Sequence, residues 1–314
     1  MRHLLKTAIL LTALLLTMAT AAQAATTPPI VTYVKGGQTY TMNFASACGT
    51  GNALKNATEI TATGTWTSTQ VGWLEGALGT GTTSDTNTTL LTADLSAAVW
   101  NAAEVYELQG LFKNCTALTT VKLPAGGAAG EATFSQTFYD CKALTSVTNL
   151  SKFTKVSCFN NTFRGCSALQ SVTLSASGSS ADAIDFTAAF LNCSKLTSIV
   201  NIEKFTNVNS FSNAFSACPI LESVTLCPEG STVDNDIEFN SAFYGCKALT
   251  SIANLDKYTK ASNFSETFRN CTALKDITLP VPADATKSIT FQYAFSGCTA
   301  LERVANLDEY KNVS

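Results

Sequence analysis

Histidine is almost absent from the sequence. Its single histidine, His3, lies in a segment that has the form of a removable leader. The remaining chain therefore has no serine–histidine triad, no histidine-based zinc site and no imidazole general base. Cysteine nucleophiles lack their usual histidine partner as well. The segment "GGAAG" (126–130) lacks both the Gly-x-Gly-x-x-Gly order and the Gly-Lys-Ser/Thr ending of phosphate-binding loops, so we interpret it as an ordinary loop.

Charged residues are also scarce. They make up 14% of the chain, against about 25% in ordinary globular proteins, and threonine, serine and asparagine supply the polarity instead. The basic residues form no cluster, so the sequence carries no electrostatic footprint for nucleic acid or for an anionic membrane surface. We expect no nucleic-acid partner.

The first 24 residues are typical of a secretory signal peptide. Arg2 and Lys6 precede an apolar run over residues 8–19, and the small residues at 22–24 suit a cleavage site. The run is shorter than the ~20 residues of a bilayer-spanning helix, and no second run of that length follows. We expect cleavage after Ala24 and no membrane span afterwards, with an uncleaved anchoring helix as the alternative. The mature chain would carry 18 basic against 23 acidic residues.

Eleven cysteines in an exported chain would ordinarily indicate a disulfide framework. Eight of them, however, recur at intervals of 26, 25, 27, 25, 28, 25 and 27 residues, which indicates a repeat. We expect these eight to be buried free thiols that act as small apolar groups. Three cysteines fall outside the register, and their disulfide state stays open. The register cysteines are Cys115, Cys141, Cys166, Cys193, Cys218, Cys246, Cys271 and Cys298, and the other three are Cys48, Cys158 and Cys227.

Aligned on these cysteines, the repeat reads Phe-x-x-x-Phe-x-x-Cys-x-x-Leu-x-x-Val/Ile, with a degenerate first copy from Leu108. Offsets of 0, 4 and 7 residues share one face of a helix, so the spacing predicts a short helix in each unit. The alternation in "LQSVTL" (169–174) then predicts a short strand with one buried face. One unit buries too little apolar surface to fold alone, and stacked units form a solenoid. The seven regular copies start at Phe134, Phe159, Phe186, Phe211, Phe239, Phe264 and Phe291.

Long and short units alternate along the chain. Short units place asparagine where long units have an inward leucine, and we expect each amide to bond the backbone of the adjacent coil. Long units carry irregular loops rich in glycine, alanine, serine and proline, which we predict to lie on one edge and to form the recognition surface. The asparagines are Asn149, Asn201, Asn254 and Asn306, and the loops are 124–133, 175–184, 227–237 and 280–289.

The motif Phe-x-x-x-Phe-x-x-Cys-x-x-Leu-x-x-Val-x-Leu resembles the BspA-like leucine-rich repeats of bacterial surface proteins. Residues 57–98 are similar to the strand–helix–strand segment that precedes the repeats in Bacteroides-type members. The resemblance implies an α/β solenoid with short helices and one short strand per repeat, a β-rich N-terminal cap over residues 25–107 and repeats over 108–314. The last unit stops short, and a bare solenoid end would expose apolar surface.

The resemblance further implies a secreted or cell-surface protein that mediates adhesion or protein–protein recognition, with host matrix proteins among the partners of some members. It implies no enzymatic activity and no cofactor, and it transfers no catalytic, cofactor-binding or metal-binding residue. The alternative function is a polysaccharide-binding module that uses the hydroxyl groups on the outward face of the strands. Asp234, Asp236 and Glu238 of "DNDIE" are a weaker candidate for calcium ligands if that segment is extended.

Overall fold

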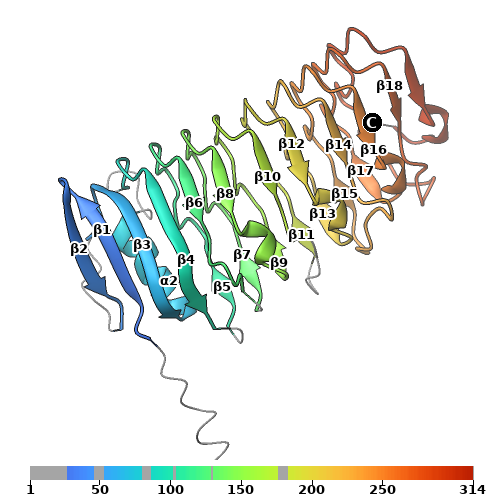
Figure 1. Cartoon of the computed structure of the whole chain (residues 1–314). Helices are drawn as coiled ribbons and strands as arrows, with labels where there is room; N and C mark the ends of the chain where they lie inside the picture. Colours follow the sequence, from blue (N-terminus) through green and yellow to red (C-terminus); the bar gives the residue numbers. More distant parts are fainter. Residues whose placement is uncertain are drawn as a thin grey trace, which may run out of the picture.

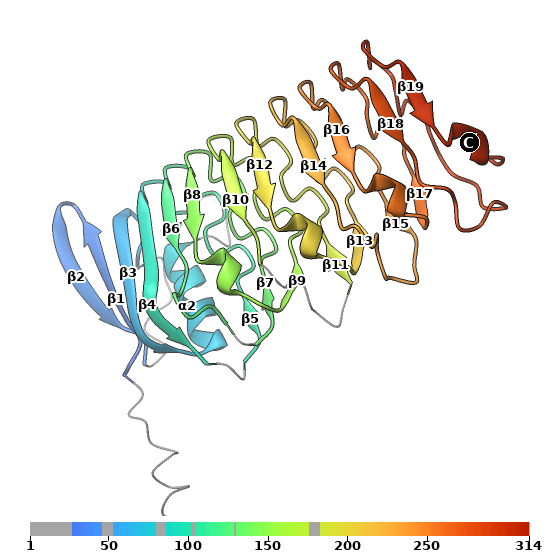
Figure 2. The ribbon, with the colours of Figure 1, turned by 45° about the vertical axis from the view of Figure 1, so that its right-hand side comes forward.

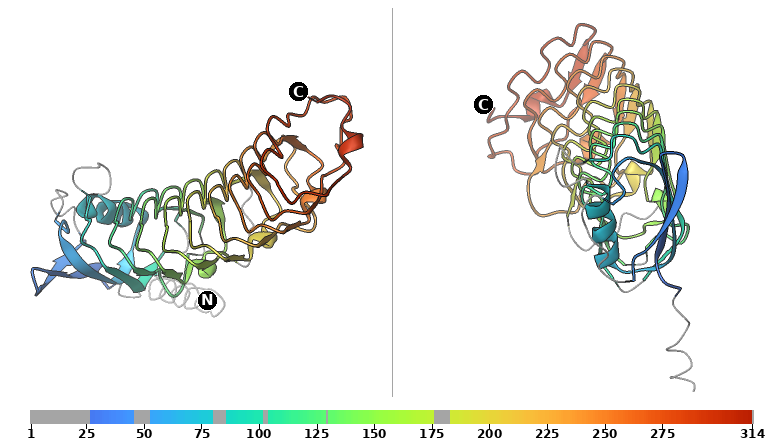
Figure 3. Two further views of the ribbon diagram at one scale, coloured as in Figure 1. Left: turned by 90° about the horizontal axis from the view of Figure 1, so that it is seen from above. Right: turned by 90° about the vertical axis from the view of Figure 1, so that its left-hand side faces the viewer.

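The computed structural model describes residues 27–45, 53–79, 86–101, 104–128, 130–175 and 183–313. The predicted signal peptide and Cys48 lie outside these ranges. The chain forms an elongated, curved stack of coils that runs from the N-terminal strands to the last repeats (Figures 1 and 3). The predicted solenoid is therefore confirmed. Among the described residues, no helix is long and apolar enough to cross a bilayer.

The N-terminal strands cover the first end of the stack. Strands β1 (Ile30–Lys35) and β2 (Gln38–Asn43) form an antiparallel pair, and β1 also pairs antiparallel with β3 (Ala57–Trp66). Helix α2 (Ser68–Leu78) connects β3 to the parallel strand β4 (Thr92–Trp100), and a capping box at Thr67 fixes where this helix begins. Strand β4 then pairs in parallel with β6 (Thr120–Lys122), so one sheet continues from this end into the repeats.

Each repeat before the last contributes one strand to each of two parallel rows, and the last repeat contributes a strand to the first row only. In the first row, the strand of a long unit pairs in register with that of the following short unit (Figure 2). Its strands are β6 (Thr120–Lys122), β8 (Ser146–Thr148), β10 (Ser171–Thr173), β12 (Ser198–Val200), β14 (Ser223–Thr225), β16 (Ser251–Ala253), β18 (Asp276–Thr278) and β19 (Arg303–Ala305). The second row is a seven-stranded sheet of β5 (Tyr106–Glu107), β7 (Ala132–Thr133), β9 (Val156–Cys158), β11 (Ile184–Asp185), β13 (Val208–Ser210), β15 (Ile237–Glu238) and β17 (Ala261–Asn263).

The predicted short helix in each repeat is wrong, because the Phe-x-x-x-Phe-x-x-Cys segment is a chain of tight turns. Cys141 N–H donates to the Phe138 carbonyl three residues earlier, whereas Phe138 N–H donates to Thr162 in the next coil. Gln136 and Asp140 have φ of 53° and 55°, in the left-handed region that an α-helix excludes. Turns with one left-handed residue in every four keep the same side chains inward, so both structures satisfy the spacing. Helix α2 is the one α-helix among the described residues.

Stacked phenylalanine rings fill the core beneath these turns. The first phenylalanine of each motif forms one ladder and the second forms another, with ring centroids of successive coils 5.0 to 6.1 Å apart. An aromatic ring from each short unit meets the first ladder edge to face, as Phe205 does at 5.6 Å from Phe159 and 5.3 Å from Phe186. In the last coil, Phe291 and Phe295 are only partly buried, whereas their counterparts in earlier coils are at most 1% exposed.

The register cysteines lie beside the phenylalanine ladders as free thiols, as predicted. Each thiol from Cys141 onwards donates to the carbonyl of the second phenylalanine in the preceding coil, with sulfur–oxygen distances of 2.8 to 3.1 Å. A cysteine at this position thus fills an apolar site and also satisfies a buried carbonyl. Outside the register, Cys158 and Cys227 are free too.

The asparagines of the short units bond to the backbone of the preceding coil, as predicted. For example, Asn254 Nδ2 lies 2.8 Å from the Leu226 carbonyl oxygen, and the other three amides make the same contact. All four also have φ between 65° and 72°, which ends the strand and begins a one-turn 3₁₀ helix. The helices are η1 (Leu150–Lys152), η2 (Ile202–Lys204), η3 (Leu255–Lys257) and η4 (Leu307–Glu309).

Replacing Asn254 with leucine, the residue of the long units, is expected to destabilise the fold by ~2–4 kcal/mol. The change removes a hydrogen bond and forces a bulky residue into the left-handed region. Asn254→Gly keeps the backbone conformation accessible, so we expect a clearly smaller loss in urea unfolding. Equal losses of unfolding free energy for the two variants would mean that the left-handed backbone conformation at Asn254 does not contribute to the loss.

Candidate functional site

The described loops of the long units and the 3₁₀ helices of the short units lie along the same edge of the solenoid, here called the loop edge. It is the lower edge in Figures 1 and 2, whereas the opposite edge carries the uniform Cys-x-x-Leu turns. The first loop (124–133) and the third and fourth loops (227–237 and 280–289) are described almost completely. The second loop falls largely outside the described residues.

Two loop glycines hold the loops against the neighbouring short units. Gly127 and Gly230 have φ of 65° and 74°, and a Cβ added to them would lie 2.1 Å from Lys152 O and 2.3 Å from Lys257 O. Only glycine permits so close a backbone approach. The segment "GGAAG" therefore makes a structural contact with η1, which agrees with its interpretation as a loop.

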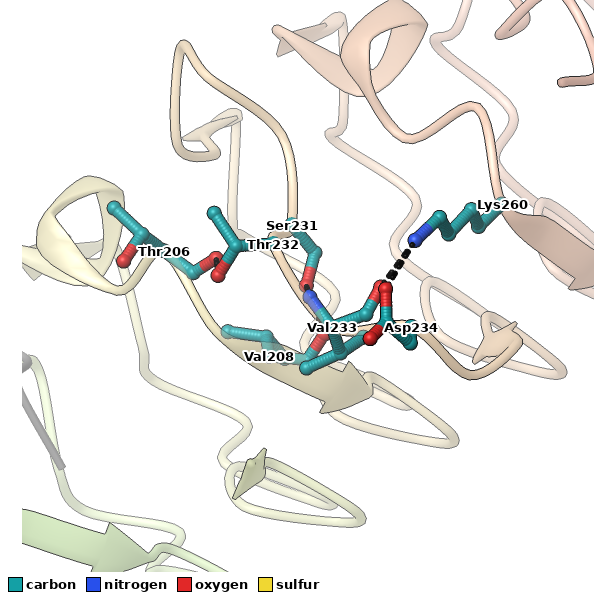
Figure 4. A network of polar contacts seen from close by, with 7 residues as sticks. All are labelled: Thr206, Val208, Ser231, Thr232, Val233, Asp234 and Lys260. Atoms are coloured by element: carbon teal, nitrogen blue, oxygen red, sulfur yellow. Dashed lines mark hydrogen bonds and ion pairs between the residues drawn. The ribbon is translucent and has the colours of Figure 1, made fainter. Parts of the chain in front are cut away.

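The third loop is hydrogen-bonded to the coil before it (Figure 4). Thr232 donates from both its backbone N–H and its hydroxyl to the Thr206 carbonyl, at 2.6 and 2.9 Å. Ser231 Oγ donates to the Val208 carbonyl at 2.6 Å. Because these bonds hold the backbone as well as side chains, the loop has a defined position on the solenoid.

The same loop is held to the coils after it by two lysines. Lys260 Nζ lies 2.8 Å from the Val233 carbonyl oxygen and 3.3 Å from Asp234 Oδ1 (Figure 4). Lys287 of the fourth loop forms an ion pair with Asp236 of the third. Lys287 therefore connects two loops that are separated by an entire short unit, and Lys260 connects the third loop to that short unit.

A cavity of about 230 Å³ opens between the third and fourth loops. Its rim carries charges of both signs, and among its apolar lining residues Ala261 and Ile289 are buried. This composition suits recognition of a polar surface. Hydrogen bonds from the Thr286 hydroxyl and N–H hold the pKa of the Asp284 carboxyl below its ordinary value. The charged lining residues are Asp234, Asp236, Lys260, Asp284 and Lys287, and the apolar ones are Ala261, Pro282, Ala283 and Ile289.

The structure does not bring the three suggested calcium ligands together. Asp234 contacts Lys260 and Asp236 pairs with Lys287, while Glu238 accepts a bond from the Ser262 hydroxyl at 3.4 Å. The described residues contain no group of three histidine, cysteine, aspartate or glutamate side chains placed to hold a metal ion. The sequence pattern did not point to the two lysines. They could have been identified as basic residues that follow an acidic loop by one and two coils.

In the middle of the strand row the outward face presents small polar side chains, as the alternation predicted, whereas Lys122, Asp276 and Arg303 are exposed toward its ends. Ser171, Thr173, Ser223 and Thr225 are exposed there. Val200 of the intervening short unit interrupts the hydroxyl groups and is 47% exposed. This face is therefore flat and chemically mixed, in contrast to the charged cavity of the loop edge.

Comparison with known proteins gives a family. The family described as "BspA type Leucine rich repeat region" matches residues 109–241 and 237–313, in six copies. A crystal structure of a leucine-rich repeat protein from Bacteroides ovatus is similar at 17% identity and a TM-score of 0.43, over 76% of this chain and 64% of that one. A structure of a TLR13–ssRNA13 complex is similar at 15% identity and a TM-score of 0.28, over 79% and 41%. No curated protein gives a significant match.

Proposed function

The chain belongs to the BspA type leucine-rich repeat family, and from this premise we propose that it is an exported, non-catalytic protein that recognises another protein at the cell surface through its loop edge. The signal-peptide pattern of residues 1–24 supports export. The likeness of the fold alone names no partner. Adhesion, with a host matrix protein as partner, is the specific form of this function that we propose to test.

One observation carries this proposal: the core repeats with little change, whereas the third and fourth loops differ in length and sequence yet are held in place. Variable side chains on a rigid scaffold are where recognition commonly resides. The hydrogen bonds of Lys260 and the Asp236–Lys287 ion pair reduce the ordering that a partner would have to impose. The rim also offers both signs of charge to a protein surface.

Shortening all four loops to the length of a short unit is expected to abolish binding to any matrix protein that captures the mature chain. Asp234→Lys combined with Asp284→Lys reverses two exposed rim charges and removes the contact of Asp234 with Lys260 and the bonds from Thr286 to Asp284. We expect it to weaken the same binding about tenfold. The measurement is surface plasmon resonance against a panel of purified matrix proteins, with circular dichroism to confirm folding.

The matched control places lysines on the strand face, as Thr148→Lys, Thr173→Lys and Thr225→Lys in one variant. This variant is expected to bind as the unmodified chain does. The opposite ranking, with the loops dispensable and the strand face essential, would overturn the proposal and favour polysaccharide binding on the strand hydroxyl groups.

A further inference from the structure

The face formed by the stacked turns carries a cavity of about 400 Å³ that is separate from the loop edge. Figure 3 shows these turns as a regular succession of coils along one side of the solenoid. The cavity is lined by Asn192, Ser194, Ala217, Pro219, Tyr244, Gly245, Lys247 and Asn270. No acidic residue is among them, and most of the lining is apolar or uncharged.

The floor of this cavity results from small residues at one repeat position. Backbone bonds fix the register: Asn192 N–H donates to the Ser216 carbonyl at 2.9 Å, and Ala217 N–H donates to the Tyr244 carbonyl at 2.7 Å. Asn192, Ala217, Gly245 and Asn270 therefore follow one another in successive coils. With about 4.8 Å per coil, the two asparagines lie ~14 Å apart, and only alanine and glycine lie between them. The cavity is thus a trough along the solenoid axis.

One wall of the trough is a tyrosine ring with an open face. Arg269 lies 5.8 Å from the ring centroid of Tyr244, on the side of the following coil. On the side of the preceding coil the equivalent residue is Ser216, which is too small to cover the ring. Tyr139 provides a contrast at the same repeat position, because Lys113 and Arg164 lie 5.2 and 5.3 Å from its ring centroid.

The polar groups around the trough are available to a ligand. In the described part of the chain, the side chains of Asn192, Asn270 and Lys247 make no hydrogen bond or ion pair, whereas Ser194 Oγ donates to Ser167 O at 3.2 Å. Asn270 Oδ1 packs against Gly297 of the following coil, which leaves its amide N–H groups for a ligand. Amides offer both donors and acceptors, and the ammonium offers donors alone. These groups therefore surround an aromatic face with uncommitted hydrogen-bonding capacity.

We propose that this trough binds an oligosaccharide of two or three sugar rings. A pyranose ring has an apolar C–H face that suits the open face of Tyr244, and its hydroxyl groups both donate and accept, as the asparagine amides do. A segment of that size matches the ~14 Å between Asn192 and Asn270. This site lies on a different face from the proposed protein-binding loops and does not depend on them.

The test is a glycan array probed with the mature chain, followed by isothermal titration calorimetry with the best oligosaccharide. Tyr244→Ala is expected to raise the Kd about tenfold or more. Gly245→Asn should block the trough while preserving the fold, since asparagine tolerates the φ of 72° there and a Cβ would meet its nearest atom, Ala217 Cα, only at 3.9 Å.

Two controls separate this site from the rest of the molecule. Tyr139→Ala removes the equivalent ring whose faces are already covered, and the loop-shortened variant removes the loop edge, so both should keep the glycan affinity. Absence of any array signal, or glycan binding that survives both Tyr244→Ala and Gly245→Asn, would overturn the proposal. Binding of the trough to an acidic peptide with no glycan bound would overturn it as well.

Discussion

Phe190→Ala is expected to destabilise the solenoid by ~3–5 kcal/mol, because the ring is fully buried and has no replacement nearby. Phe190 stacks on Phe163 at 5.5 Å and on Phe215 at 5.8 Å, so its removal leaves a cavity in the middle of a ladder. In a repeat protein each coil is stabilised chiefly by its neighbours, so a gap in a central coil weakens two interfaces at once. Denaturant unfolding monitored by circular dichroism measures the loss.

The matched control is Thr173→Ala on the exposed face of β10, which should change the free energy of unfolding by no more than about 0.5 kcal/mol. Equal and small losses for the two variants would contradict the assignment of inside and outside. A further outcome is informative about cooperativity. Two separate transitions for Phe190→Ala would show that the coils on either side of the gap unfold independently.

The solenoid could be predicted from the sequence because its core repeats in both residue type and spacing. The short helix could not, since offsets of 0, 4 and 7 satisfy an α-helix and a chain of turns equally well. The distinguishing signal was the residue before each cysteine, which is often asparagine or glycine, as in Asn192 and Gly245. These residue types favour the left-handed backbone that the structure has there.

The candidate site was predictable only in outline. Irregular loops in alternating units indicated an edge where side chains vary, and the structure has loops along one edge. The Asp236–Lys287 pair joins residues 51 positions apart across a short unit, so its formation depends on how the two loops fold back. The open ring face of Tyr244 depends on the small size of Ser216 in the preceding coil, a relation that appears only once the coils are in register.

Raising the pH above about 8.5, the ordinary pKa of a thiol, is expected to destabilise the folded chain steeply. Burial raises the pKa of the Cys115 and Cys246 thiols to about 12 and those of the other register cysteines above their ordinary value. The folded chain therefore keeps thiol protons that the unfolded chain releases. Their stabilising effect is complete below the unfolded pKa and is lost as the pH rises toward the folded pKa.

Each fully buried thiol should lower the free energy of unfolding by about 1.4 kcal/mol per pH unit in this range, and several together exceed the stability of a typical domain. Urea unfolding at pH 8, 9 and 10 measures the slope. Lysine and tyrosine also titrate near pH 10, so a Cys166→Ala, Cys193→Ala variant serves as the control. Its absolute stability will be lower, but its loss of unfolding free energy per pH unit should be smaller by the contribution of the two missing thiols.

At pH 8, a thiol reagent should modify the register cysteines of the native chain slowly. It should modify those of the denaturant-unfolded chain rapidly without any reductant. An unchanged pH slope in the variant, or thiols that stay unreactive in denaturant, would show that buried free thiols do not stabilise the stacked coils.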